Sequence, residues 1–129
     1  LGLACAVDFT RYLLWERLDP SLQERLRREQ VISLPSPYGE PYLITLKLIE
    51  EARRHHLLDR PHLAIHVPVR LNHGMADADV PWRTSIAVAE KLCGADVRVL
   101  LVKDGEHTLS RDQDLRLLTQ TLAELLDRR

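Results

Sequence analysis

The chain has 129 residues, of which 45% are hydrophobic and 29% are charged, and its formal net charge at pH 7 is -1. This length suits one domain or part of a larger one, and a near-neutral charge offers no field that would attract nucleic acid or an anionic membrane. No stretch approaches the roughly 20 apolar residues that are needed to span a bilayer.

The chain begins at Leu1 with the apolar stretch "LGLACAVDFT". No basic segment precedes this stretch, which argues against a signal peptide. We interpret residues 1–8 as a core strand that has lost its upstream context, and we expect the sequence to be the C-terminal part of a longer protein. The two cysteines, Cys5 and Cys93, are expected to be buried free thiols, as in a reducing compartment.

Residues 9–60 are predicted to form a mostly helical insertion. Ser21 and Glu24 have the spacing of a capping box, which predicts a charged surface helix that ends near Glu29. Three prolines and a glycine make "SLPSPYGEPY" a loop or hinge. The apolar spacing of "YLITLKLIEEARRHHLL", with basic residues at its end, predicts a second helix over 41–57.

Residues 61–129 are predicted to alternate between strands and helices. "VPVRLNHG" alternates as a strand does, a helix is expected over 82–93, and "VRVLLVK" predicts a strand at 97–103 that is buried on both faces. A last helix follows Ser110, whose capping partner would be Gln113. A helix that crosses between two strands implies a parallel pair. We therefore predict an α/β fold with three parallel strands and flanking helices.

Two loops leave the last two predicted strands at their carboxyl ends, where the sites of open α/β sheets gather. "HGMADADVPW" follows the first strand, and "DGEH", in which Gly105 permits a tight turn, follows the second. Neighbouring strands are about 4.8 Å apart, so we expect Asp77 to reach His107. The acid would fix the tautomer of the imidazole and leave its other nitrogen as a base, which is two thirds of a nucleophile–His–acid triad.

Other polar residues near these loops have simpler interpretations. Asp79 could replace Asp77 as the acid, although its place just ahead of a helix better suits helix capping. Asp104 is interpreted as a turn former, and His73 as a residue that hydrogen-bonds the acid loop.

No cofactor or metal site is predicted. The histidine pairs lack the pattern of a zinc site, and no glycine-rich phosphate loop is present. Trp15 and Trp82 are expected to pack against neighbours, although Trp15 could line an acyl pocket. A nucleophilic serine is not evident, because no serine has glycines two residues to each side. The serines are Ser21, Ser33, Ser36, Ser85 and Ser110.

The loop "HGMADADVP" resembles the acid loop His-Gly-x-x-Asp-x-x-Val-Pro of α/β-hydrolase-fold serine hydrolases, and "DGEH" resembles their His turn. With "LPSPYGEPY", "LIEEARRH" and "VKDGEHTLSR", the resemblance covers nearly the whole chain. It extends to the group that includes the mitochondrial palmitoyl-protein thioesterase and acyl-glucuronide esterase, together with their bacterial relatives. The match corresponds to the last third to half of that fold.

The resemblance implies a role for each part of the chain. Asp77 matches the triad acid, His107 matches the triad base, and residues 9–60 match the cap over the active site, whereas the serine would lie upstream. It implies an esterase or thioesterase that acts on small-molecule or acyl-protein esters without a cofactor. The expected location is the bacterial cytoplasm or, alternatively, the mitochondrion. Two alternatives stay open: an inactive fragment or interaction module, and a hydrolase with an Asp or Cys nucleophile.

Overall fold

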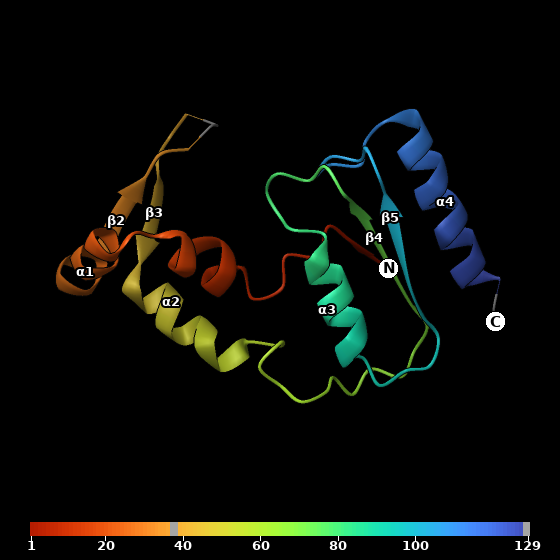
Figure 1. Cartoon of the computed structure of the whole chain (residues 1–129), viewed down its shortest axis with the longest axis horizontal. Helices are drawn as coiled ribbons and strands as arrows, with labels where there is room; N and C mark the ends of the chain where they lie inside the picture. Colours follow the sequence, from red (N-terminus) through yellow and green to blue (C-terminus); the bar gives the residue numbers. More distant parts are fainter. Residues whose placement is uncertain (37–38, 128–129) are drawn as a thin grey trace. The chain divides into compact units, whose positions relative to one another are not determined.

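Two compact units make up the chain in the computed structural model, which describes residues 1–36 and 39–127 (Figure 1). The larger unit combines Leu1–Val7 with Leu57–Arg129, and the smaller unit is Asp8–His56. Each unit has its own sheet.

The larger unit contains a three-stranded parallel sheet with the strand order β1–β4–β5. β1 is Gly2–Leu3, β4 is Val69–Gly74 and β5 is Val97–Val102. The predicted parallel sheet is therefore confirmed. The first strand is much shorter than the predicted 1–8, because Ala4 adopts a left-handed φ of 43° that ends the extended backbone.

Two helices flank this sheet, one on each side (Figure 1). α3 is Arg83–Lys91 and connects β4 to β5, while α4 is Asp112–Leu126 and closes the unit. Within the described residues, no helix is long and apolar enough to cross a membrane.

The central strand β4 is buried on both faces. Every residue from Arg70 to Gly74 is buried, so the alternation in "VPVRLNHG" does not mark one exposed face. The reason is topological: β4 has a strand on each side and a helix on each face. The buried guanidinium of Arg70 lies 3.0 Å from the carboxylate of Asp96, which follows α3.

The smaller unit packs helices around an antiparallel hairpin and a compact apolar core. Its elements are, in chain order, a π-helical turn (Thr10–Leu14), a 3₁₀ turn (Trp15–Arg17), α1 (Pro20–Glu29), β2 (Val31–Leu34), β3 (Tyr42–Thr45), α2 (Leu46–Ala52) and a 3₁₀ turn (Arg53–His55). The buried core consists of Leu18, Leu26, Ile32, Ile44 and Ile49. Trp15 packs against this core, as expected for a packing residue.

The β2–β3 hairpin corrects two predictions. Strand residues occupy both ends of the predicted loop at 33–42, and the predicted helix at 41–57 begins only at Leu46. "YLIT" pairs with Val31–Leu34 because its aromatic and β-branched residues suit a strand. Thr45 then caps α2 by accepting the backbone N–H of Leu48 at 3.1 Å. Residues 37 and 38 of the predicted loop lie outside the described residues.

Both predicted capping boxes are wrong. At the start of α1, Asp19 accepts the backbone N–H of Leu22 at 2.9 Å, and the Ser21 hydroxyl donates to Asp19 instead. At the start of α4, Asp114 accepts the backbone N–H of Arg111 at 3.3 Å, in place of the expected Ser110 and Gln113 pair. In each case a neighbouring aspartate provides a stronger, charged acceptor.

The two cysteines are free thiols, but they are less buried than expected. Cys5 is half-buried, and this burial raises the pKa of its thiol. Cys93 is exposed because α3 ends at Lys91, before the predicted helix boundary.

Candidate active site

The acid loop and the His turn begin side by side at the carboxyl edge of the parallel sheet. Gly74, the last residue of β4, is in register with Val102, the last residue of β5. Main-chain hydrogen bonds then join the two loops: Met75 N–H donates to the Val102 carbonyl at 2.8 Å, and Ala76 N–H donates to the Gly105 carbonyl at 2.9 Å. The chain leaves both strands in the same direction, as the parallel topology requires (Figure 1).

Two glycines allow this close approach. A Cβ atom on Gly74 would overlap the main chain of Gly105, and a Cβ on Gly105 would lie 3.0 Å from the Cα of Gly74. Gly105 does not adopt a left-handed φ, so its role is to leave space between the loops and not to permit an unusual turn. The predicted importance of Gly105 thus has a different physical reason.

Asp77 is the centre of the site. Its side chain is 0% exposed. Its Oδ1 accepts the backbone N–H groups of Asp79 at 2.9 Å and Val80 at 2.8 Å, which is the geometry of an Asx turn. Its Oδ2 lies 2.9 Å from Nδ1 of His107 and 3.1 Å from Nε2 of His73.

These contacts set the charge of the acid. Burial is the largest single influence and acts to raise the pKa of Asp77. The hydrogen bonds from Val80, His107 and Asp79 together outweigh it, so the pKa of Asp77 lies below its usual value. Asp77 is therefore an ionised carboxylate at neutral pH, although it is buried.

His107 lies partly in solvent, with a side chain that is 43% exposed. Because a carboxylate only accepts hydrogen bonds, Nδ1 of His107 must carry the proton that it shares with Asp77. In the neutral ring, Nε2 then keeps its lone pair. No residue in the described part of the chain hydrogen-bonds this nitrogen. The arrangement can therefore take up a proton at Nε2 and stabilise the imidazolium that forms.

The rival residues have other partners. Asp79 is exposed and contributes its backbone N–H to Asp77, and α3 begins at Arg83 with no side-chain cap, so the expected capping role of Asp79 is wrong. Asp104 is ion-paired with Arg111 at 2.7 Å, and Arg111 also binds Asp114 at 2.7 Å. Asp104 therefore connects the end of β5 to the start of α4.

His73 hydrogen-bonds the acid loop, as predicted, and it has one partner that the sequence did not indicate. Its ring is fully buried, with Nε2 at 3.1 Å from the Val80 carbonyl and Nδ1 at 2.7 Å from the hydroxyl of Ser85. Ser85, His73 and Asp77 thus form a line of serine, histidine and aspartate. Ser85 is 0% exposed, so a substrate cannot reach its hydroxyl.

A metal ion would fit poorly at this site. One potential ligand atom of each of Asp77, Asp79 and His107 lies within 4.8 Å of the other two. Both oxygens of Asp77 already accept two hydrogen bonds each, and a cation would have to displace these donors.

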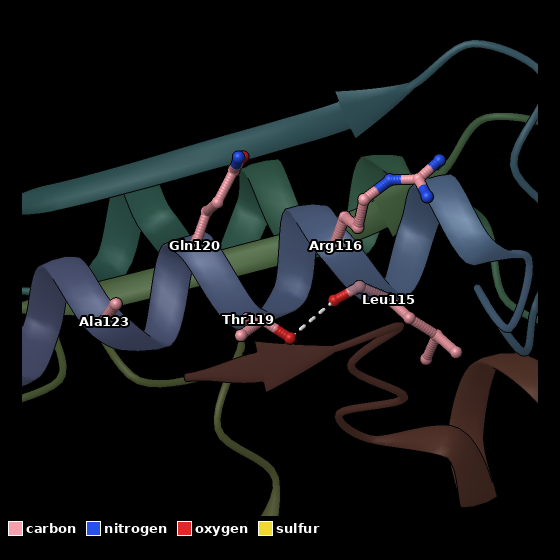
Figure 2. A pocket seen from close by; sticks show the side chains of 5 residues that line it. All are labelled: Leu115, Arg116, Thr119, Gln120 and Ala123. Atoms are coloured by element: carbon pink, nitrogen blue, oxygen red, sulfur yellow. Dashed lines mark hydrogen bonds between the residues drawn. The ribbon is translucent and has the colours of Figure 1, made fainter.

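A shallow pocket lies on α4, away from these loops, and it has no comparable chemistry. Figure 2 shows its lining residues on successive turns of the helix, with the Thr119 hydroxyl donating to the Leu115 carbonyl at 2.8 Å. Its lining residues are Leu115, Arg116, Thr119, Gln120 and Ala123.

The parallel sheet with its flanking helices is the C-terminal part of an α/β-hydrolase fold, because two solved structures of this fold match nearly the whole chain. "Alpha/beta hydrolase domain-containing protein 10 from mouse" matches 98% of this chain, with a TM-score of 0.83 and 35% sequence identity. A putative hydrolase from Agrobacterium vitis matches 95% of it, with a TM-score of 0.85 and 31% identity. These matches cover 51% and 47% of the two solved chains, respectively.

The homologues with curated names are palmitoyl-protein thioesterases. "Palmitoyl-protein thioesterase ABHD10, mitochondrial" from Pongo abelii is 38% identical over 130 residues, which is 99% of this chain. The chain spans 42% of the length of that relative. No family model matches the chain.

Proposed function

We propose that this chain provides the acid and the base of an α/β-hydrolase active site that cleaves acyl thioesters or esters. In this proposal Asp77 is the triad acid, His107 is the general base, and the nucleophilic serine belongs to a segment outside these 129 residues. The similarity to palmitoyl-protein thioesterases favours a long-chain acyl thioester as the substrate. The observation that carries the proposal is the 2.9 Å contact between the buried Asp77 carboxylate and the half-exposed His107 ring.

The proposed reaction has two halves, acylation and deacylation, each with two proton transfers through His107. Nε2 of His107 takes the serine hydroxyl proton while the serine oxygen attacks the carbonyl carbon of the thioester. The carbon–sulfur bond then breaks, and His107 returns the proton to the leaving thiolate. In the second half, His107 takes a proton from water, which attacks the acyl-serine, and returns the proton to the serine oxygen as the free acid leaves.

Asp77 has two tasks in this scheme. It holds His107 with the proton on Nδ1, and its negative charge stabilises the imidazolium that forms when Nε2 is protonated. Burial removes competing water, the donors Val80, His107 and Asp79 keep the carboxylate ionised, and four hydrogen bonds fix its orientation before the reaction begins.

The test uses the natural gene product that contains these residues and a long-chain acyl thioester as substrate. We expect His107→Ala to lower kcat by at least about 10⁴-fold, because the general base is lost. His66→Ala changes an exposed histidine that lies away from the acid loop and should leave kcat unchanged. Asp79→Asn tests the second candidate acid. It keeps the backbone N–H that Asp77 accepts and removes an exposed carboxylate charge within 4.8 Å of the site, so we expect kcat to stay within about tenfold of the wild type.

A fluorophosphonate probe tests the position of the nucleophile. The 129-residue chain alone should not be labelled, because its serines lack the strand-to-helix elbow and Ser85 is buried. Labelling of the isolated chain would contradict the proposed location of the serine. A gene product that hydrolyses thioesters equally well without His107 would contradict the proposed function.

A further inference from the structure

The buried residue His73 has contacts that constrain both its tautomer and its neighbours. Its Nε2 faces Oδ2 of Asp77 and the carbonyl oxygen of Val80, each at 3.1 Å. Both of these atoms only accept hydrogen bonds, so Nε2 must carry a proton. The hydroxyl of Ser85, at 2.7 Å from Nδ1, can donate to that nitrogen, and a neutral ring then satisfies every contact.

This arrangement ties the acid loop together at two points. His73 lies in β4, whereas Val80 lies at the far end of the loop, so the bond to the Val80 carbonyl closes the loop on the strand. The bond to Oδ2 reaches the same carboxylate oxygen that His107 uses. Rotation of the Asp77 carboxylate away from His107 would therefore break a hydrogen bond to His73 as well.

We propose that His73 is a positioning residue for the Asp77–His107 pair: its Nε2–H holds Oδ2 of Asp77 against Nδ1 of His107, and the Ser85 hydroxyl fixes the required tautomer of His73. His73 does not contact a substrate, because it is fully buried. This inference extends the proposed function, since it assigns a residue that controls the orientation of the general base.

The structural part of the inference can be tested without any catalytic activity. In the natural gene product that contains these residues, labelled with ¹⁵N-histidine, long-range ¹H–¹⁵N spectra at about pH 8 report which ring nitrogen of each neutral histidine carries the proton. We expect His73 to be protonated on Nε2 and His107 on Nδ1. A wild-type His73 that is protonated on Nδ1 would overturn the proposal, because that tautomer cannot donate to Asp77.

Three variants separate positioning from packing. His73→Leu keeps an apolar side chain but removes the donor, and we expect His107 to shift toward the Nε2-protonated form. His73→Gln places an amide N–H near the original Nε2 position and should restore the wild-type His107 tautomer. Ser85→Ala removes the hydroxyl that donates to Nδ1, so the Nδ1-protonated form of His73 should gain population relative to the wild type, although both acceptors still face Nε2. His66→Leu changes an exposed histidine and is the control.

The outcomes distinguish this inference from the proposed function. If His107 keeps its proton on Nδ1 in both His73→Leu and Ser85→Ala, His73 does not position the pair. If His73→Leu does not fold, the His107 tautomers of His73→Gln and Ser85→Ala are compared with that of the wild type, and they decide whether His73 positions the pair. In the natural gene product, we expect His73→Leu to lower kcat by up to about 100-fold with KM unchanged, and His73→Gln to restore most of the loss. If no hydrolase activity is detected, the proposed function fails, but the tautomer measurements still test whether His73 positions the Asp77–His107 pair.

Discussion

At the scale of single residues, the site depends on how completely Asp77 is supplied with donors. Two backbone N–H groups and two imidazoles face its carboxylate, and none of these neighbours accepts a hydrogen bond from it. A buried carboxylate is normally costly, but here each oxygen has two partners. The side chain is therefore held as an oriented anion, which is what a histidine base requires of its partner.

The variant Asp77→Asn tests this orientation directly. We expect kcat to fall by about 10⁴-fold, because an amide has one acceptor oxygen and places an N–H₂ group opposite either His107 or the backbone donors. His107 should then carry its proton on Nε2 and lose its proposed function as a base. The check is kcat of the natural gene product, together with the His107 tautomer in the same protein labelled with ¹⁵N-histidine. If Asp77→Asn is active and its His107 tautomer is unchanged, Asp77 is not the triad acid.

Single residues also show what the sequence could and could not predict about the site. The contact between Asp77 and His107 was predictable because each residue follows a strand within a few residues, and parallel strands bring those ends together. The contact between His73 and Ser85 was not, because Ser85 lies on α3 and its hydroxyl points into the interior, which no local pattern signals. Cys93 was predicted to be buried only because the end of α3 was placed too far along the chain.

At the scale of elements, two glycines control how closely β4 and β5 can present their loops. Gly74 and Gly105 leave no room for a side chain between the two backbones, and main-chain hydrogen bonds across this gap fix the loops in register. The distance between Asp77 and His107 follows from this backbone contact.

The variant Gly74→Ala should therefore damage both stability and the site. The added methyl group overlaps the main chain of Gly105, and we expect the free energy of unfolding to fall by about 1–3 kcal/mol. Gly94→Ala is the matched control, because its methyl group would crowd the backbone of Ile65 and His66 at a distance from the site. Urea unfolding measures the stability of both variants. Only Gly74→Ala should also change the His107 tautomer, and an unchanged tautomer in a folded Gly74→Ala chain would contradict this role.

The elements that the sequence did not predict share a physical cause. The segment "YLIT" fits both a helical and a strand-like apolar pattern, and its pairing with residues 31–34 decides between them. The prolines and the glycine of residues 33–42 favoured the prediction of a loop, and the hairpin was therefore not predicted. For α1 and α4, several polar residues near each start could have been the cap, and charge decided in favour of an aspartate.

At the scale of the whole molecule, carboxylates with lowered pKa values link stability to pH. A hydrogen bond from Ser21 lowers the pKa of Asp19, and a hydrogen bond from Arg25 lowers the pKa of Glu29. Arg111 donates to both Asp104 and Asp114 and lowers the pKa of each. Asp77 belongs to the same group. Since each folded-state pKa lies below the unfolded value, these groups stabilise the fold above the unfolded pKa values and lose that contribution as pH falls through the folded values.

We therefore expect the free energy of unfolding to decline steadily below about pH 4.5, where carboxylates begin to be protonated in the unfolded chain. Urea unfolding at pH 7, 5, 4 and 3 measures this decline. Asp114→Asn should flatten the curve, because its side chain is nearly buried against Arg111 and its titration is then removed. A stability that stays constant from pH 5 to pH 3 would show that these ion pairs and hydrogen bonds do not contribute.

The groups that hydrogen-bond the Asp77–His107 pair and its loops lie on one continuous segment of the larger unit, from His73 in β4 to His107 ahead of α4. Residues 8–56 belong to the other unit, which has a core of its own. Substitutions in residues 8–56 can thus accumulate while the Asp77–His107 pair and its hydrogen-bonding groups are inherited unchanged. Homologues that differ widely across residues 8–56 are then expected to keep the Asp77–His107 contact.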